Sequence, residues 1–417
     1  MIVSLVIDSV YWKPSIAEIP YSLETLSDHS KHQADAILIN ERNAHYFSSK
    51  PSCGVQLAFQ NSSLFLLQVT DAQLVIENYT RYFFSSCRSI NHWVGVTGTN
   101  GKTTTVYYLE QLLSDHYAVA TIGTLGVRIK GEKVKEAFSS NTTLPLLELI
   151  KAAKLAVASG CEIILLEASS IGFVEGRLNN IPFSCIVAHE VSHDHLDYHG
   201  SFNHYLDVKQ QIVQLASCCV VTKPAYLQGL KSKNSLVVLP TSDLHKLNEA
   251  TAVSCCEFLR LSYTKKKLTS PPGRYEVITI GDVRVVIDFA HTPDALQKLV
   301  DSFQGSKTLI IGCGGDRDRA KREVIGQIAE IQCNRVIITM DNPRFEDSLQ
   351  PLLDIKKGAP SALILADRRA AIWYALTTSK QGDIVIIAGK GNEPFIEYRE
   401  VKIPYTDRSV IEEWVNQ

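Results

Sequence analysis

The stretch Val94-Gly95-Val96-Thr97-Gly98-Thr99-Asn100-Gly101-Lys102-Thr103-Thr104-Thr105 decides the fold of the central part of this chain. The apolar run that ends at Val96 predicts a buried strand, and the segment 106–113, which is apolar at helical spacing, predicts a helix. A glycine-rich turn between a strand and a helix is typical of a phosphate-binding loop, because its N–H groups and the positive end of the helix attract phosphate oxygens. In such a loop Lys102 reaches the β- and γ-phosphates, and Thr103 binds Mg²⁺.

The match to the phosphate-loop pattern is offset by one position. The leading glycine of the pattern would fall at Val96, whereas Gly95 lies one place earlier. The alternative is a glycine-rich turn with a surface lysine. The order of glycines, lysine and threonine after the strand favours nucleotide binding. The expected nucleotide ligands in the loop are Gly98, Thr99, Asn100, Gly101, Lys102, Thr103 and Thr104.

The composition excludes several classes of function. The 417 residues include 42 basic and 44 acidic side chains, which disfavours nucleic acid or an anionic membrane as the main partner. Ten cysteines without a CxxC pair are typical of reduced thiols in a cytoplasm. The N-terminus lacks a basic region and reaches Asp8 early, so we expect no signal peptide, and no apolar run approaches the roughly 18 residues of a membrane span. We expect a monomeric cytoplasmic protein that acts on small molecules.

Four runs in the C-terminal third are continuously apolar, which indicates strands buried on both faces, as in a parallel sheet. These runs are residues 308–311, 335–338, 362–365 and 384–387. A polar loop follows each run, at residues 314–319, 341–344, 367–368 and 389–393. Because parallel strands end at one edge of a sheet, these loops should gather there. Their arginines and carboxylates indicate a site for a zwitterion such as an amino acid, and ordinary solvated loops are the alternative.

The order of these elements predicts an α/β protein of three domains. The run 265–273 combines consecutive lysines with Pro-Pro-Gly, which predicts a hinge. We expect a small N-terminal α/β domain over residues 1–88, a central P-loop parallel-sheet ATPase domain over 89–268 and a C-terminal Rossmann-like domain over 269–417.

Two further segments carry metal-binding side chains. The apolar run 163–166 ends in Glu167, and an acid at a strand end near a phosphate loop suits Mg²⁺, although a capping carboxylate is the alternative. The segment 193–199 reads His-Asp-His-Leu-Asp-Tyr-His, close to the HxHxDH zinc cluster of metallo-β-lactamase-like hydrolases. Its last histidine is His199, one place later than in that cluster, and such a hydrolase has no use for a phosphate loop.

Together these motifs resemble the Mur ligase superfamily. The shared series is GTNGKTTT at 98–105, Asn-Thr-Thr at 141–143, EASS at 167–170, DHLDYHG at 194–200, Lys209, PGRYE at 272–276, DFAHTPDAL at 288–296, GCGGDRDRAKR at 312–322, DNPR at 341–344, AGKGNE at 388–393 and YTDR at 405–408. The run DFAHTPDAL followed by GCGGDRDR resembles the MurE-type branch, the UDP-N-acetylmuramoyl-tripeptide synthetases. Folylpolyglutamate synthases belong to the same superfamily but carry a GKGS-type loop and lack DNPR.

The resemblance implies an ATP-dependent amide ligase that works through an acyl phosphate and Mg²⁺. Lys102, Glu167, His195 and Lys209 would be the catalytic residues. Thr103, Glu167, His195 and Lys209 would hold metal, with Lys209 carbamylated, and a solvated helix lysine is the alternative for Lys209. From the C-terminal domain, Arg274, Asp288 and His291 would contact ATP.

Two groups of substrate ligands follow from the same resemblance. The UDP-linked muramoyl dipeptide would contact Asn141, Thr142, Thr143, Ser169, Ser170 and Arg177. The incoming amino acid would contact Arg317, Asp341, Asn342, Arg344, Gly389 and Glu393. In the family, DNPR accompanies meso-diaminopimelate, because a guanidinium pairs with the distal carboxylate that diaminopimelate has and lysine lacks.

Several family motifs are altered. Residues 189–195 read HEVSHDH where the family has TNLSRDH, Ile171 and Asn392 replace histidines, and the family's N-x-D-D segment is not recognisable near 221–224. The N-terminal region also lacks the KPGDLF…DGHDF signature of the uridine site. Two alternatives therefore stand beside the tripeptide synthetase: a similar ligase for another peptide or carrier acceptor, and a nucleotide-binding relic without turnover.

Overall fold

The computed structural model describes residues 5–7, 10–12, 23–25, 36–39, 65–68, 80–222, 234–238 and 244–417. The short N-terminal pieces are β1 (Leu5–Ile7) antiparallel to β2 (Val10–Trp12), and β3 (Leu23–Thr25), β4 (Ala36–Ile39) and β5 (Phe65–Gln68) in a parallel sheet. Most of the predicted acceptor domain over 1–88 thus lies outside the described residues, as does most of the N-terminal segment for which no signal peptide is expected.

The chain divides into two compact units, which are described separately. One comprises Met1–Thr97, Leu113–Val187 and Ile212–Cys219, and the other comprises Gly98–Leu112, Ala188–Gln211 and Val220–Gln417. None of the described helices combines the length and the apolarity needed to cross a bilayer.

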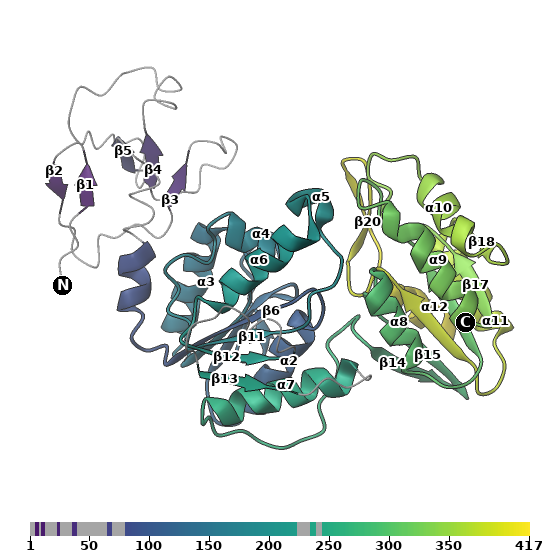
Figure 1. Cartoon of the computed structure of the whole chain (residues 1–417), viewed down its shortest axis with the longest axis horizontal. Coiled ribbons are helices and arrows are strands. Elements are labelled where there is room, and N and C mark those ends of the chain that lie inside the picture. Colours follow the sequence, from purple (N-terminus) through teal and green to yellow (C-terminus); the bar gives the residue numbers. More distant parts are fainter. Residues whose placement is uncertain are drawn as a thin grey trace. The chain divides into compact units, whose positions relative to one another are not determined.

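The larger sheet has the strand order β13-β12-β11-β6-β10-β7-β8-β9. Figure 1 labels the first four of these strands, β13, β12, β11 and β6. Its parallel strands include β6 (His92–Thr97), β7 (Val119–Gly123) and β10 (Ile163–Glu167), and every residue of β7 and β10 is buried. This burial on both faces confirms the strands predicted before residue 97 and before Glu167. The other strands are β8 (Gly126–Ile129), β9 (Glu132–Lys133), β11 (Cys185–Ala188), β12 (Cys218–Val221) and β13 (Asn234–Val237).

The parallel register aligns the ends of β6 and β10. Glu167 is the partner of Val96, and the N–H of Ala168 donates to the carbonyl of Val96 over 2.8 Å. The acid therefore stands at the strand edge from which the phosphate loop departs. The helices that accompany this sheet are α2 (Lys102–Leu113), α3 (Leu146–Ala158), α4 (Ser170–Val174), α5 (Leu196–His199), α6 (Phe202–Val213) and α7 (Leu244–Phe258).

The second sheet has the order β14-β15-β19-β16-β17-β18 and contains a strand in each of the four predicted C-terminal runs. The predicted burial on both faces is wrong for the run 362–365, because β18 is a two-residue strand at the edge of the sheet and neither of its residues is buried. Only β14 runs antiparallel. The strands of this second sheet are β14 (Glu276–Ile280), β15 (Val283–Ile287), β16 (Lys307–Ile311), β17 (Arg335–Ile338), β18 (Leu363–Ile364) and β19 (Ile384–Ala388). The accompanying elements are α8 (Pro293–Asp301), α9 (Ala320–Gln332), α10 (Gln350–Gly358), α11 (Arg368–Thr378), α12 (Asp407–Val415) and the hairpin β20 (Phe395–Tyr398) with β21 (Val401–Pro404).

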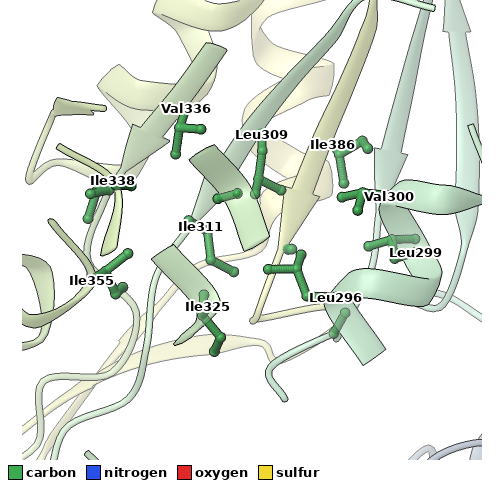
Figure 2. Packing of buried hydrophobic residues seen from close by; sticks show 14 of the residues in the cluster. Leu296, Leu299, Val300, Leu309, Ile311, Ile325, Val336, Ile338, Ile355 and Ile386 are labelled. Atoms are coloured by element: carbon green, nitrogen blue, oxygen red, sulfur yellow. The ribbon is translucent and has the colours of Figure 1, made fainter. Parts of the chain in front are cut away.

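Branched aliphatic side chains fill the space between this sheet and its helices (Figure 2). Leu309, Ile311 and Ile386 project from the strands toward Leu296 of α8 and Ile325 of α9, and each of these residues is fully buried. Burial of one such side chain contributes about 1.5–3 kcal/mol. This core fixes the strand ends and therefore the loops that carry the predicted amino-acid site.

Candidate functional site

The phosphate loop leaves β6 at Thr97 and enters α2 at Lys102. Gly98 and Gly101 have φ values of 134° and 88°, which favour glycine. A Cβ on Gly98 would lie 2.6 Å from the Cβ of His189, and one on Gly101 would lie 2.7 Å from the Oδ1 of Asn248. Both glycines are therefore required by the backbone and by the close approach of neighbouring side chains.

His189 is the buried neighbour of this loop. Its Nε2 lies 2.7 Å from the Oγ1 of Thr105, and the residue is 4% exposed. Burial, with a smaller contribution from the ammonium of Lys102, lowers the pKa of His189 to about 3, so the ring is neutral. The adjacent Glu190 accepts the N–H of Thr99 through its carbonyl over 3.1 Å. Residues 189 and 190, at the start of the segment HEVSHDH, thus contact the phosphate loop directly, a role that the sequence alone did not reveal.

Two lysines donate to carbonyls of the phosphate loop. Lys102 Nζ donates to the carbonyls of Gly98 over 2.9 Å and Thr99 over 3.0 Å, and Lys209 Nζ donates to Gly98 over 3.2 Å. Lys209 on α6 is 3% exposed, so the alternative of a solvated helix lysine is wrong. Burial and the charge of Lys102 hold the pKa of Lys209 well below its usual value, against the opposing effect of Asp194.

Asp194 lies between two imidazoles. Its Oδ2 is 3.5 Å from the Nε2 of His195 and 3.8 Å from the Nε2 of His291. Burial alone would raise the pKa of Asp194, but His291, His195 and Lys321, together with the backbone N–H of His195, outweigh it and the net pKa is lowered. Burial lowers the pKa of His291 to about 4. The predicted ATP ligand His291 and the predicted metal ligand His195 are therefore linked through an acid that was not selected as a site residue.

Within the segment 193–199, His193 contacts an aromatic ring and His195 has an unusual backbone conformation. The ring of His193 stacks on Phe202 with centroids 4.6 Å apart and an interplanar angle of 19°. His195 has a φ of 53°, in the left-handed region, and directly precedes α5 without capping it through its side chain. Among the described residues, no group of three or more His, Cys, Asp and Glu side chains could hold a metal ion.

An open pocket of about 580 Å³ adjoins the phosphate loop. Five of the predicted nucleotide ligands line it: Asn100, Gly101, Thr104, Arg274 and Asp288. Asp288 accepts the N–H groups of Tyr275 and Ala290, each over 2.6 Å. Burial raises the pKa of Asp288, and the guanidinium of Arg274 opposes this shift.

The pocket wall contains residues that sequence patterns did not reveal. The ring of Tyr275 stacks between His245, 5.5 Å away, and Phe303, 5.2 Å away. Asn248 on α7 is 6% exposed, and its Oδ1 has no hydrogen-bond partner among the described residues. A buried acceptor in a pocket with an aromatic wall suits a planar ring that carries an amino group. Only Tyr275 belonged to a motif, so no sequence signal distinguished the others.

A second cluster surrounds Glu167, which is 1% exposed. Its Oε1 accepts the N–H of Thr124 over 2.8 Å, and its Oε2 accepts the hydroxyl of Thr124 over 3.1 Å. The hydroxyl of Thr143 lies 2.7 Å from the carbonyl of Glu167 and 2.9 Å from the hydroxyl of Ser169. Arg177 donates to the carbonyl of Thr143 over 2.6 Å. Thr124, in the turn between β7 and β8, is the member that sequence reasoning missed.

The remaining predicted dipeptide ligands border this cluster. The hydroxyl of Thr142 lies 3.5 Å from that of Thr124, and Ser170 is buried at the start of α4. Asn141 is exposed in the segment that leads to Thr143. Ser169 accepts the N–H of Gly172 and caps α4, which accounts for its position.

The predicted amino-acid ligands gather at the carboxyl edge of the second sheet. Arg344 has a φ of 54°, and its side chain donates to the carbonyl of Gly315 over 2.7 Å and pairs with Glu397 over 3.1 Å. Asn342 donates from Nδ2 to Glu393 over 2.7 Å. A Cβ on Gly389 would lie 3.3 Å from Asp341 Oδ2, and Arg317 is exposed on the loop after β16. Lys390 and Glu397 also belong to this cluster, although neither was predicted.

Comparison with known families identifies the middle and C-terminal parts of the chain. Residues 96–253 match the Mur ligase middle domain, and residues 273–391 match the Mur ligase glutamate ligase domain.

Two curated relatives carry the same description, UDP-N-acetylmuramoyl-L-alanyl-D-glutamate–2,6-diaminopimelate ligase. The protein from Synechococcus elongatus is 32% identical, over 76% of this chain and 74% of its own length. The protein from Caldanaerobacter subterraneus is 29% identical, over 83% of this chain and 82% of its own length.

Solved structures agree with these matches. A structure of a UDP-N-acetylmuramoyl-L-alanyl-D-glutamate–2,6-diaminopimelate ligase superposes with a TM-score of 0.57 at 25% identity, covering 95% of this chain and 94% of the other. MurF ligase from Thermotoga maritima in complex with ADP gives a TM-score of 0.63 at 18% identity, covering 92% of this chain and 87% of the other. The second likeness concerns the fold, and it confirms the predicted α/β class.

Proposed function

We propose, on the premise that this chain belongs to the Mur ligase family, that it is an ATP-dependent amide ligase of peptidoglycan synthesis. It joins meso-diaminopimelate to UDP-MurNAc-L-Ala-D-Glu through an acyl phosphate. The observation that carries this proposal is the buried Lys209, whose Nζ lies 3.2 Å from the carbonyl of Gly98 in the phosphate loop. A relic without turnover would have no reason to keep a lysine buried beside a phosphate loop, where burial of a cation is costly.

The phosphate loop supplies the first requirement of the reaction, which is to offset the charge of the phosphates. Lys102 and the N-terminus of α2 lie next to the position that the β- and γ-phosphates would take. The acceptor carboxylate then attacks the γ-phosphorus, its new P–O bond forms as the bond to ADP breaks, and an acyl phosphate results. Thr99, Asn100 and Thr104 would hold the remaining phosphate oxygens.

Four residues of this chain would hold Mg²⁺: Thr103, Glu167, His195 and Lys209. The hydroxyl of Thr103 and the carboxylate of Glu167 fit the ion, because Mg²⁺ prefers oxygen ligands, and Lys209 would offer oxygens only as a carbamate. The bound ion would supply charge stabilisation at the transferred phosphate. Lys209 fits a carbamate, because burial lowers the pKa of its amine and so favours the neutral form, and a neutral amine adds to CO₂ with release of one proton.

The nucleotide base would enter the pocket lined by Arg274, Asp288 and Asn248. The unpartnered Oδ1 of Asn248 supports this assignment, because it can accept a hydrogen bond from an exocyclic amino group. His291, which approaches Asp194, would contact the nucleotide from the C-terminal side.

The two peptide-forming substrates would use the two other clusters. The dipeptide end of the acceptor would contact Thr143, Ser169 and Arg177, with Asn141, Thr142 and Ser170 beside them. Diaminopimelate would contact Arg344 through its distal carboxylate and Glu393 through an amino group, with Arg317, Asp341, Asn342 and Gly389 completing the site. Its reacting amine, uncharged at the moment of attack, displaces phosphate from the acyl phosphate and forms the amide bond.

Domain limits and cellular setting belong to the same proposal. The divisions at residues 88 and 268 separate an acceptor domain, an ATP domain and an amino-acid domain, and the two family matches fall inside the second and third. A reducing cytoplasm is supported by the cysteines, since all nine of those described are free. We also propose that the protein acts as a monomer.

One experiment separates this proposal from its alternatives. Purified protein is given ATP, Mg²⁺ and UDP-MurNAc-L-Ala-D-Glu, with diaminopimelate or lysine in parallel, and phosphate release is measured. Release that requires diaminopimelate supports the proposal. Folded, ATP-binding protein that releases phosphate with neither amino acid would contradict it and favour another acceptor or a relic.

A further inference from the structure

Lys390 is a fully buried cation at the proposed amino-acid site. It lies two residues after the end of β19, beyond Gly389, and has an exposed fraction of 0%. Its Nζ lies 2.9 Å from Asn342 Oδ1, 3.2 Å from Glu393 Oε2 and 3.5 Å from Asp341 Oδ1. All three partners belong to the proposed diaminopimelate site, so this lysine is shielded from solvent and contacts the residues that form the site.

These contacts determine which way the amide of Asn342 points. An ammonium and a backbone N–H can only donate, so the atom that receives Lys390 Nζ and the N–H of Glu397, 3.0 Å away, must be the amide oxygen. The NH₂ group of Asn342 then faces Glu393, to which it donates over 2.7 Å. Loss of Lys390 would remove one of the two donors that keep this orientation.

The charge of Lys390 offsets only one of the two carboxylates that it contacts, those of Asp341 and Glu393. The ammonium of Lys390 lies between the carboxylates of Asp341 and Glu393, and the buried Asp341 Oδ1 takes part in this ion pair but accepts no hydrogen bond in the described part of the chain. Two carboxylates held by one lysine therefore retain an excess negative charge that can attract a substrate ammonium. On the neighbouring loop, Arg344 is held by Glu397 at 3.1 Å and can meet a carboxylate.

We propose that Lys390 is a positioning residue for the incoming amino acid. It orients Asn342 and Glu393 and partly neutralises the acidic end of the site without touching the substrate. This inference rests on the proposed function, because it assumes that the amino acid binds at Asn342, Arg344 and Glu393.

The test compares Lys390→Met with Lys357→Met, a control on α10 whose side chain is 60% exposed and pairs with Asp354. Steady-state phosphate release gives KM for diaminopimelate and for ATP. For Lys390→Met we expect KM for diaminopimelate to rise at least tenfold, with KM for ATP within twofold of wild type. The control should leave both constants unchanged. A purely structural lysine would change both KM values together or neither.

A double variant tests whether Lys390 acts through Asn342. If it does, adding Lys390→Met to Asn342→Ala should raise KM for diaminopimelate less than threefold further. Should Lys390→Met prove unfolded by circular dichroism, Lys390→Arg takes its place, with an expected rise of at least threefold in the same KM. An unchanged KM in a folded variant, or fully multiplicative effects in the double variant, overturns the inference. Wild-type protein without diaminopimelate-dependent turnover instead removes the proposed function and this inference with it.

Discussion

Lys209 Nζ donates a hydrogen bond to the carbonyl oxygen of Gly98 over 3.2 Å, so a side chain of α6 contacts the first glycine of the phosphate loop. Lys102 Nζ donates to the same carbonyl over 2.9 Å. Two cations that share one acceptor repel each other, and burial further disfavours the charge on Lys209. The arrangement becomes favourable once one of the lysines carries an anionic group, which is the physical argument for carbamylation of Lys209.

We therefore predict a carbamate on Lys209. Protein equilibrated with ¹³C-bicarbonate should show a carbamate carbon signal by NMR, and Lys209→Met should lack it. Activity should fall at least tenfold after CO₂ is removed and return when bicarbonate is added. Lys246→Met, a substitution on α7, is the control and should keep both the carbamate signal and the activity. A carbamate signal that persists in Lys209→Met would contradict the assignment.

The guanidinium of Arg344 should select the amino acid. We predict that Arg344→Ala raises KM for diaminopimelate at least tenfold, a loss of about 1.4 kcal/mol, because the distal carboxylate loses its charged partner. KM for ATP should stay within twofold. Arg335→Ala, which removes a guanidinium bonded to Thr308 and Thr378, is the matched control. Unchanged diaminopimelate kinetics in Arg344→Ala would remove this residue from the site.

Sequence patterns predicted the parts of this structure that depend on local order. The phosphate loop, the strand before Glu167 and the four C-terminal strands follow from apolar runs and glycine spacing. The same runs also predicted that the loops of Asn342 and Lys390 meet at one sheet edge, but not the hydrogen bond between these side chains, because its partners are 48 residues apart and no local pattern pairs them. Asn248 escaped notice for the same reason, since nothing near it in sequence marks the helix face that meets Gly101.

Gly101 should tolerate no side chain. Its φ is 88°, and a Cβ there would lie 2.7 Å from Asn248 Oδ1 and 3.0 Å from the ring of His189. Gly131 has a similar φ of 85° with nothing within 4 Å of the added Cβ, so it is a matched control for backbone strain alone. We predict that Gly131→Ala costs about 1–2 kcal/mol of stability and leaves ATP binding intact.

Gly101→Ala should cost at least as much stability and, in addition, raise the Kd for ATP tenfold or more. The reason is that the loop must move away from Asn248 and His189 to admit the methyl group. Urea unfolding and titration calorimetry of both variants measure the two effects. Equal ATP affinity in Gly101→Ala and Gly131→Ala would show that the close approach to Asn248 has no role in nucleotide binding.

His189 should make the protein sensitive to mild acid. Its pKa is about 3 in the folded chain and about 6.5 in the unfolded chain, so below pH 6.5 the unfolded state binds a proton that the folded state does not. The stability linked to His189 is therefore present above pH 6.5 and is lost as the pH falls toward 3. Between pH 7 and pH 5 the loss should be about 2 kcal/mol.

His189→Gln keeps a hydrogen-bonding group near Thr105 but cannot titrate, so its free energy of unfolding should fall by about 2 kcal/mol less than that of wild type over this interval. Urea unfolding at pH 7, 6 and 5 measures the difference, which cancels the contributions of the other histidines. Parallel pH dependences in the two proteins would mean that His189 has the same pKa in the folded and the unfolded chain, so that it does not support the loop as a ring kept neutral by burial.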